Sequence, residues 1–149
     1  MHQADFRFGC PLRVRWSEAD PQGIVFNGHY LNYADVGVTE YYRALRAAEP
    51  ARMQLTGEEF FAVKTLLEYR APAMFDDLLD VQLRLSRFGN SSMSFTLGIF
   101  RAGQLLVTGE IVYVHADQQT RQPLPIPQDF KAAVRAFEQL TPEETANPG

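Results

Sequence analysis

The chain has little cysteine, no long apolar segment and no excess of basic residues. One cysteine, Cys10, occurs among the 149 residues, so no disulfide can form within the chain, and the composition suits a reducing cytoplasm. No apolar run approaches the roughly 20 residues that span a bilayer, and residues 1–10 lack the basic and apolar regions of a signal peptide. The formal net charge of −4 argues against a broad surface for nucleic acid or anionic membranes. We therefore expect a cytoplasmic protein that binds neither.

Two common kinds of ligand site are also missing from the sequence. The 10 glycines form no nucleotide-binding fingerprint. Cysteine and histidine do not recur at the spacings of metal ligands. We therefore expect neither a metal site nor a bound cofactor.

The sequence does contain enough apolar material for one core. Hydrophobic residues make up 46% of the chain and charged residues 21%, as in ordinary globular domains. The length suits one domain, and no linker or internal repeat divides it. We expect a single domain over residues 1–140 and a disordered tail over residues 141–149.

The hydrophobic pattern predicts five strands. They are expected at residues 6–16, 60–70, 81–88, 92–100 and 104–117. The last three are joined by short turns at Gly89-Asn90 and Ala102-Gly103, and strands joined in this way run antiparallel.

One long helix is predicted between the first two strands, over residues 28–47. Its apolar positions cover about half of the helix circumference, and the small residues Ala34 and Gly37 would let another layer approach closely. A short C-terminal helix is expected around Phe130, Val134 and Phe137. The predicted fold class is therefore α+β, with a curved five-stranded antiparallel sheet wrapped around a long central helix. The helix positions expected to be buried are Tyr30, Tyr33, Ala34, Gly37, Val38, Tyr41, Ala44 and Leu45.

The candidate functional residue is Asp20, in the loop that precedes the long helix. Asp before Pro and Gly is typical of a turn in which the side chain bonds its own backbone, and that reading requires no function. The functional reading depends on the helix that begins near Asn27, because the first N–H groups of a helix lack partners and lie at its positive end. Such donors can stabilise an oxyanion, and a carboxylate beside them can act as nucleophile or general base in acyl transfer.

Other polar residues have simpler interpretations. Asn27 suits a helix N-cap, and His29 in the first turn is a possible base without an evident orienting partner. Glu40 is expected to form a structural pair with an Arg or Tyr. Cys10 is expected in the core, and His115 with Asp117 at a solvated strand end.

The segment "VRWSEADPQGIVFNGHYLNYADVGVTEYYR" resembles the acyl-CoA thioesterases of the 4-hydroxybenzoyl-CoA thioesterase type, which have the hotdog fold. The resemblance continues in "YRAPAMFDDLLDVQLRLSRFGNSSMSF" and covers nearly the whole chain to about residue 117. It rests on Asp-x-x-Gly-Ile-Val-Phe, a following Tyr and a later Thr-Glu. In this chain the matching residues are Asp20, Gly23, Ile24, Val25, Phe26, Tyr30, Thr39 and Glu40.

The resemblance implies hydrolysis of acyl-CoA thioesters, with coenzyme A present only as part of the substrate. Asp20 matches the catalytic aspartate, and the backbone N–H of Asn27 matches the oxyanion donor. Family members often carry His or Tyr where this chain has Asn27, and Asn where it has His29. The substrate-binding residues that the resemblance implies are Gly23, Ile24, Val25, Phe26, His29, Tyr30, Arg87, Gly89, Asn90, Ser91 and Ser92, the last five for the nucleotide phosphates.

The resemblance also implies a homo-oligomer, either a dimer or a tetramer, with sites between protomers. The exposed edges of a single sheet support the same expectation. Three other readings stay open: a non-catalytic hotdog protein that binds or senses acyl-CoA, a hotdog dehydratase or hydratase that uses His29, and an unrelated α+β fold around an apolar ligand.

Overall fold

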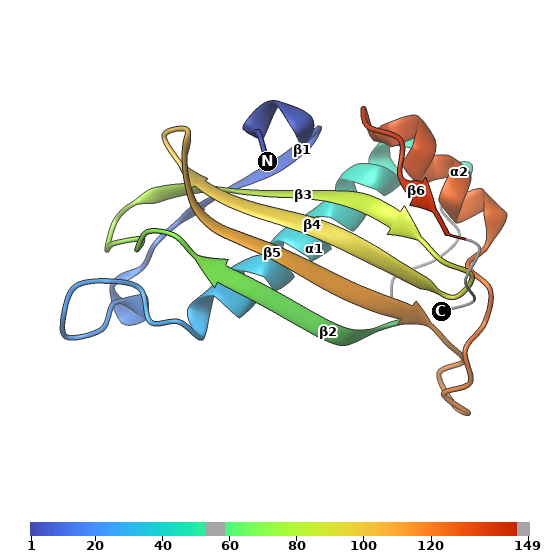
Figure 1. Ribbon diagram of the computed structural model, residues 1–149, viewed down its shortest axis with the longest axis horizontal. Helices are drawn as coiled ribbons and strands as arrows, with labels where there is room; N and C mark the ends of the chain where they lie inside the picture. The colour runs from blue at the N-terminus through green and yellow to red at the C-terminus, as the bar shows by residue number, and fades with distance from the viewer. Residues whose placement is uncertain (53–58, 146–149) are drawn as a thin grey trace.

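The computed structural model describes residues 1–52 and 59–145. The order of elements agrees with the sequence patterns, apart from two 3₁₀ turns, η1 and η2, and a last short strand (Figure 1). The elements are η1 (Gln3–Asp5), β1 (Phe8–Arg13), η2 (Trp16–Glu18), α1 (His29–Ala48), β2 (Phe60–Tyr69), β3 (Leu78–Phe88), β4 (Ser92–Arg101), β5 (Gln104–His115), α2 (Gln128–Phe137) and β6 (Glu143–Glu144).

The strands form one sheet in the order β1-β3-β4-β5-β2, and all neighbours in this path are antiparallel. The two predicted tight turns join β3 to β4 and β4 to β5. In the second turn Ala102 and Gly103 both have positive φ, at 47° and 83°, which matches the right-handed twist of the flanking strands. Strands β1 and β2 are the edges of this path.

Helix α1 packs across one face of the sheet, as Figure 1 shows. Seven of its eight predicted core positions are buried, and Ala44 is half-buried. Gly37 lies so close to the sheet that a Cβ there would meet Leu83 Cδ1 and Val81 Cγ1, each at 2.8 Å. The expected fold, a curved antiparallel sheet around a central helix with a short C-terminal helix, is therefore confirmed.

The first strand is shorter than predicted. It ends at Arg13, and Trp16, expected on its apolar face, instead starts η2 with 75% of its surface exposed. Cys10 is half-buried rather than enclosed in the core. The alternating pattern continued past Arg13 because a 3₁₀ turn of three residues is too short to leave a periodic signature of its own.

Part of the segment expected to be a disordered tail is ordered. Strand β6 pairs in parallel with Arg87 and Phe88 of β3, and Glu144 forms ion pairs with Lys131 and Arg135 of α2. Residues 146–149 of that tail lie outside the described part of the chain. Among the described residues, no helix combines the length and apolar character needed to cross a membrane.

Candidate functional site

Asp20 begins a tight turn that connects two short backbone segments, residues 18–20 and 24–26, which we call the two limbs of the Asp20 loop. Its N–H donates to Ile24 O at 2.8 Å, and its carbonyl accepts the Gly23 N–H at 2.9 Å. Gly23 has φ +82°, a conformation that only glycine adopts without strain, and Pro21 supplies the fixed φ that favours such a turn. The Asp20 carboxylate is half-exposed, and its Oδ1 accepts the Gln22 N–H at 2.8 Å. This is the turn-forming bond expected of Asp before Pro.

The two limbs lead directly to the start of α1. Ala19 and Val25 form an isolated antiparallel bridge, and the Phe26 N–H donates to Glu18 O at 3.1 Å. The N–H groups of His29 and Tyr30 are bonded to Phe26 O and Asn27 O, which closes the first turn. Among the described residues, no intramolecular acceptor is present for the N–H of Asn27. That donor is therefore available at the helix start, on the chain segment that pairs with the Asp20 limb.

The N-cap position itself differs from the prediction. Gly28 is the N-cap residue of α1, without a side-chain cap bond, and Asn27 lies one residue before it. The difference matters little for the stabilisation of an oxyanion, because the backbone N–H of Asn27 rather than its side chain is the candidate donor.

A buried glutamate, Glu18, holds the limb that leads to Asp20. It is 5% exposed, and its Oε1 accepts the hydroxyl of Tyr33 at 2.9 Å. The Arg15 N–H donates to Oε1 at 2.8 Å, and Arg15 Nε and Nη2 donate to Oε2 at 3.0 and 2.8 Å. Burial acts to raise the pKa of Glu18, but the bonds from Arg15 and Tyr33 outweigh it and hold the pKa below its usual range. Glu18 therefore remains a carboxylate at neutral pH.

Sequence reasoning missed Glu18. The sequence indicates this residue only weakly, by a Glu three residues after Arg15 at a short turn. Its other partner, Tyr33, lies 15 residues further along the chain in α1, so local spacing does not reveal the contact.

A second tyrosine of α1 holds the other limb. The Tyr30 hydroxyl accepts the Ala73 N–H at 3.0 Å, and the Ala73 carbonyl accepts the Val25 N–H at 2.8 Å. Burial raises the pKa of Tyr30, so its phenol stays neutral. Tyr30, expected to contact substrate, thus has a structural role for its hydroxyl.

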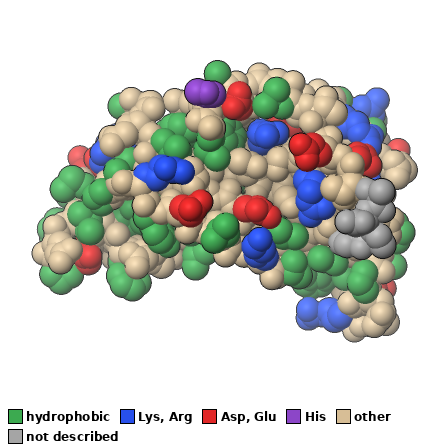
Figure 2. Space-filling model, viewed as in Figure 1, with side chains coloured by type: hydrophobic (Ala, Val, Ile, Leu, Met, Phe, Trp, Pro, Cys, Tyr) green, Lys and Arg blue, Asp and Glu red, His purple; other side chains and the backbone are tan. Residues whose placement is uncertain are grey.

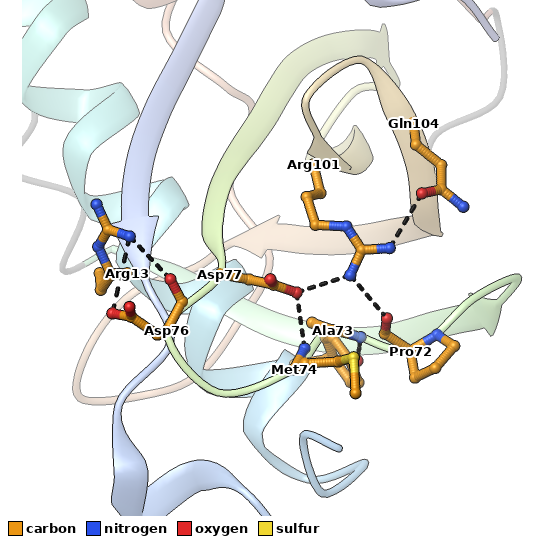
Figure 3. A network of polar contacts seen from close by, with 9 residues as sticks. Arg13, Pro72, Ala73, Met74, Asp76, Asp77, Arg101 and Gln104 are labelled. Atoms are coloured by element: carbon orange, nitrogen blue, oxygen red, sulfur yellow. Dashed lines mark hydrogen bonds and ion pairs between the residues drawn. The ribbon is translucent and has the colours of Figure 1, made fainter. Parts of the chain in front are cut away.

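The loop that carries Ala73 is itself fixed by charge, as Figure 3 shows. Arg101 donates to Asp77 Oδ2 at 2.7 Å and to the Pro72 carbonyl at 3.3 Å, and the Met74 N–H donates to Asp77 Oδ2 at 2.8 Å. These contacts tie the loop between β2 and β3 to the turn between β4 and β5. The Asp20 loop is therefore supported from two sides, by α1 and by this loop.

Several apolar side chains around the Asp20 loop are exposed. Phe26 is 57% exposed, and Trp16 packs edge-on against Phe75 with ring centroids 4.9 Å apart. The ring of His29 lies near Phe26, at 6.1 Å between centroids, and no carboxylate among the described residues orients it. Exposed aromatic groups beside a half-exposed carboxylate are suited to an apolar ligand or to another protein surface.

The residues expected to bind the nucleotide phosphates lie elsewhere. Gly89, Ser91 and Ser92 are buried at the turn between β3 and β4, and Asn90 is exposed there. Arg87 donates to the hydroxyls of Ser92, Ser94 and Thr145 at 3.2–3.4 Å. No described carboxylate forms an ion pair with Arg87.

This turn and the Asp20 loop are at opposite ends of the sheet (Figure 1). Strand β3 separates them, and its 11 residues at about 3.3 Å each span roughly 35 Å. One chain therefore brings together Asp20, Gly23 to Phe26, His29 and Tyr30, but it does not bring them to Arg87 or to the turn over 89–92.

A hollow of about 760 Å³ lies on the sheet away from Asp20, lined by side chains that include Arg84, Thr96 and Glu110. No residue from 14 to 30 lines it. The face seen in Figure 2 carries basic and acidic side chains interspersed, without a field of one sign.

The remaining candidates have structural partners. Glu40 forms an ion pair with Arg43, as expected. His115 was expected in solvent but is 6% exposed, with Nδ1 at 3.1 Å from Pro125 O, because the segment before α2 folds back over the end of β5. Asp117 accepts the Thr120 and Gln119 N–H groups, which lower its pKa. Within the described residues, no three His, Cys, Asp or Glu side chains gather as metal ligands would.

Comparison with known proteins places this architecture in a family. The model of the thioesterase-like superfamily matches residues 14–134. The chain belongs to the thioesterase-like superfamily. The matched span begins just after β1 and ends within α2, so it includes Asp20, the start of α1, Arg87 and the turn over residues 89–92.

Named relatives agree with this membership. The acyl-CoA thioester hydrolase YbgC of Escherichia coli is 30% identical over 133 residues, which cover 89% of this chain and 96% of that protein. The acyl-CoA thioesterase YbgC of Haemophilus influenzae is 28% identical over 130 residues, or 87% and 95% of the two chains. The expected enzyme class, a thioester hydrolase, is therefore confirmed.

A solved structure supports the fold independently. A thioesterase of Thermus thermophilus, solved with coenzyme A and zinc, superposes with a TM-score of 0.79 at 23% identity and covers 91% of this chain and 97% of its own. At this identity the similarity establishes the hotdog-type fold and does not extend to the ligands.

Proposed function

We propose that this protein hydrolyses acyl-CoA thioesters to a free acid and coenzyme A, with Asp20 as the catalytic carboxylate. The observation that carries the proposal is the hydrogen-bonded arrangement of two limbs, which joins the half-exposed Asp20 carboxylate to a helix start whose Asn27 N–H lacks an acceptor within the described residues. The relatives named for acyl-CoA hydrolysis support the substrate class.

The chemistry follows from these two groups. The thioester oxygen accepts the Asn27 N–H, and the positive end of α1 stabilises the negative charge that develops on that oxygen. The Asp20 carboxylate either attacks the carbonyl carbon to form a mixed anhydride, which water then hydrolyses to the free acid and the Asp20 carboxylate, or removes a proton from a water that attacks the carbonyl carbon. In both routes the C–S bond breaks and coenzyme A leaves as a thiolate, which needs no strong acid. One oxyanion donor is typically worth roughly 3–4 kcal/mol.

The substrate phosphates are assigned to Arg87 and the turn over residues 89–92. Arg87 supports this assignment because its guanidinium is bonded only to hydroxyls and has no described carboxylate to neutralise it. Since this turn is at the far end of the sheet from its own chain's Asp20, the phosphate contacts must come from a second copy of the chain.

A homo-oligomer is therefore part of the proposal. Edge strand β2 has 10 residues, most of them exposed, including Val63 at 60% and Leu66 at 47%. A long edge with exposed apolar residues is a template for pairing with another strand. Two β2 strands paired antiparallel about Leu66 would place Lys64 opposite the partner's Glu68, so the edge is complementary to itself. A dimer and a tetramer built from such dimers both satisfy this pairing.

The decisive experiment is release of coenzyme A from short, long and aromatic acyl-CoAs by the wild type and by Asp20→Asn. We expect kcat of the variant to fall at least roughly a hundredfold on every good substrate, within the range that loss of a general base produces. Because Asn also accepts the Gln22 N–H, the turn should survive, which circular dichroism and thermal unfolding can check. Unchanged turnover on every good substrate would refute the proposal, and acyl-CoA binding without turnover by the wild type would favour a sensor.

A further inference from the structure

The buried carboxylate of Glu18 has a contact pattern that the proposed chemistry does not use. A charged group in the interior is costly unless its oxygens are paired, and here four hydrogen bonds from Arg15 and Tyr33 satisfy both. Its side chain is 6% exposed, whereas that of Arg15 is 77% exposed. The chain thus keeps a charged side chain inside the protein two residues from Asp20, where a neutral side chain would have a smaller desolvation penalty.

The bond between Tyr33 and Glu18 connects the second turn of α1 to the limb that carries Asp20. The backbone of Glu18 also accepts the Phe26 N–H at 3.1 Å, directly before the oxyanion donor at Asn27. Glu18 therefore binds α1 through its side chain and the limb before Asn27 through its carbonyl. Movement of Glu18 would shift the catalytic carboxylate and the N–H donor relative to each other.

Tyr30 supports the same loop by a separate route, through the Ala73 peptide and Val25. The two tyrosines are three residues apart on α1, so they lie on one face of the helix. Their hydroxyls bind the Asp20 loop at two points, Tyr33 directly through Glu18 and Tyr30 indirectly through Ala73. Of these two contacts, the one made by Tyr33 reaches the limb that carries Asp20.

We propose that Glu18, anchored by Tyr33 and neutralised by Arg15, is a positioning residue that fixes the Asp20 carboxylate relative to the Asn27 N–H. It does not touch the reacting atoms. This inference rests on the proposed function, because it concerns the rate of a reaction at Asp20. Its effect should appear in kcat, since misplacing catalytic groups by about 1 Å can cost about a hundredfold in rate.

The test uses Tyr33→Phe, which removes the anchoring hydroxyl and keeps the buried ring. Tyr41→Phe is the matched control, because Tyr41 is also buried in α1 and also donates to a buried carboxylate, that of Glu138 at 2.6 Å, but far from Asp20. Turnover of the best acyl-CoA substrate is measured for both variants, together with their thermal unfolding. Hydrogen–deuterium exchange of residues 19–27 reports on the loop without reference to catalysis.

We expect Tyr33→Phe to lower kcat roughly tenfold to a hundredfold with KM within about twofold, and to speed exchange of residues 19–27. Tyr41→Phe should lose comparable stability and keep kcat within about twofold. In a double-mutant cycle, adding Glu18→Gln to Tyr33→Phe should lower kcat by less than the product of the two single losses, because both changes break one contact.

The outcomes separate this inference from the proposed function. Unchanged turnover in Asp20→Asn would overturn the proposed function and, with it, the catalytic role of Glu18. A large loss in Asp20→Asn with normal kcat in Tyr33→Phe would overturn only the role of Glu18. Equal losses of kcat in Tyr33→Phe and Tyr41→Phe would also overturn it, since they would reflect general softening of α1.

Discussion

The hydroxyl of Tyr41 donates a 2.6 Å hydrogen bond to the carboxylate of Glu138, 97 residues further along the chain. The same Oε2 atom accepts the Leu85 N–H at 3.0 Å, next to the position where the register of β3 against β4 shifts. Glu138 is the C-cap residue of α2 and is 7% exposed. One buried carboxylate therefore joins α1, α2 and β3.

Truncation of this carboxylate should destabilise the whole domain. In Glu138→Ala the Tyr41 hydroxyl and the Leu85 N–H lose their buried acceptor, and each unpaired group carries a desolvation cost. We expect the free energy of unfolding to fall by roughly 2–4 kcal/mol, measured by urea denaturation at neutral pH. A loss below roughly 0.5 kcal/mol, as for an exposed substitution, would contradict this account.

The same residue predicts a pH dependence of stability. Burial raises the pKa of Glu138, and the bonds from Tyr41 and Leu85 oppose the shift without cancelling it. A pKa higher in the folded than in the unfolded chain means that the folded state binds the proton more tightly. The resulting stabilisation is complete below the ordinary glutamate pKa of 4.5 and is lost as pH rises through the folded-state pKa.

Glu138→Gln removes this titration and keeps an oxygen acceptor for Tyr41. Wild type should therefore lose stability relative to the Gln variant as pH rises from about 4.5 towards neutrality. Unfolding experiments on both proteins across this range measure the difference. A difference that stays constant with pH would show that the carboxyl does not titrate in this way.

The phosphate assignment predicts a binding defect in Arg87→Ala. Loss of one charge-assisted contact should raise KM for acyl-CoA roughly tenfold and leave kcat within about twofold. Arg84→Ala is the control, because Arg84 lies on the same strand and lines the same hollow as Arg87 but is not among the residues assigned to the phosphates. With acyl-dephospho-CoA as substrate the gap between wild type and Arg87→Ala should narrow if the arginine contacts the 3′-phosphate. Equal KM values for wild type and Arg87→Ala on acyl-CoA would remove Arg87 from the site.

His29 should affect the rate only modestly. Its ring has no orienting carboxylate among the described residues, and its backbone N–H, which closes the first turn with Phe26 O, is unchanged in His29→Ala. We expect kcat or substrate preference to change by about threefold, since no described carboxylate orients the ring for proton transfer. Complete inactivation would instead favour the dehydratase or hydratase chemistry in which His29 leads.

Self-pairing of β2 predicts a charge-reversal result. Lys64→Glu should set like charges against the partner's Glu68 and shift the protein towards monomer, with activity lost in parallel. The double variant Lys64→Glu with Glu68→Lys should restore both the oligomer and turnover. Light scattering coupled to size-exclusion chromatography measures the oligomeric state of each variant.

A control separates the interface from the chain's own contacts. Lys64 also lies 3.9 Å from Glu110, an exposed pair of little energetic weight, so Glu110→Gln should leave the oligomer unchanged. A Lys64→Glu protein that keeps its wild-type mass would place the interface on another surface.

The candidate site could be found only in part from the sequence. The Asp20 turn is a local feature, because Pro21 and Gly23 specify its backbone within a few residues, and the nearby helix start follows from local periodicity. The positions of Glu18 and Ala73 depend on tyrosines of α1 that lie 15 and 43 residues away, and local spacing carries no information about such contacts. The burial of His115 cannot be inferred from local spacing for the same reason, since the segment that covers it comes later in the chain.

The sequence by itself determined the five long strands, the two helices and their order, because a period of two or of 3.6 residues and a turn residue with its required φ act within a few positions of the chain. Only the tertiary structure decided which charges are buried, that Glu18 and Glu138 each find a tyrosine of α1, and that Glu143 and Glu144 form a strand instead of a frayed end. The physical reason is that a carboxylate is stable in the interior only when donors from distant elements converge on it, and that convergence exists only after the sheet has closed around α1.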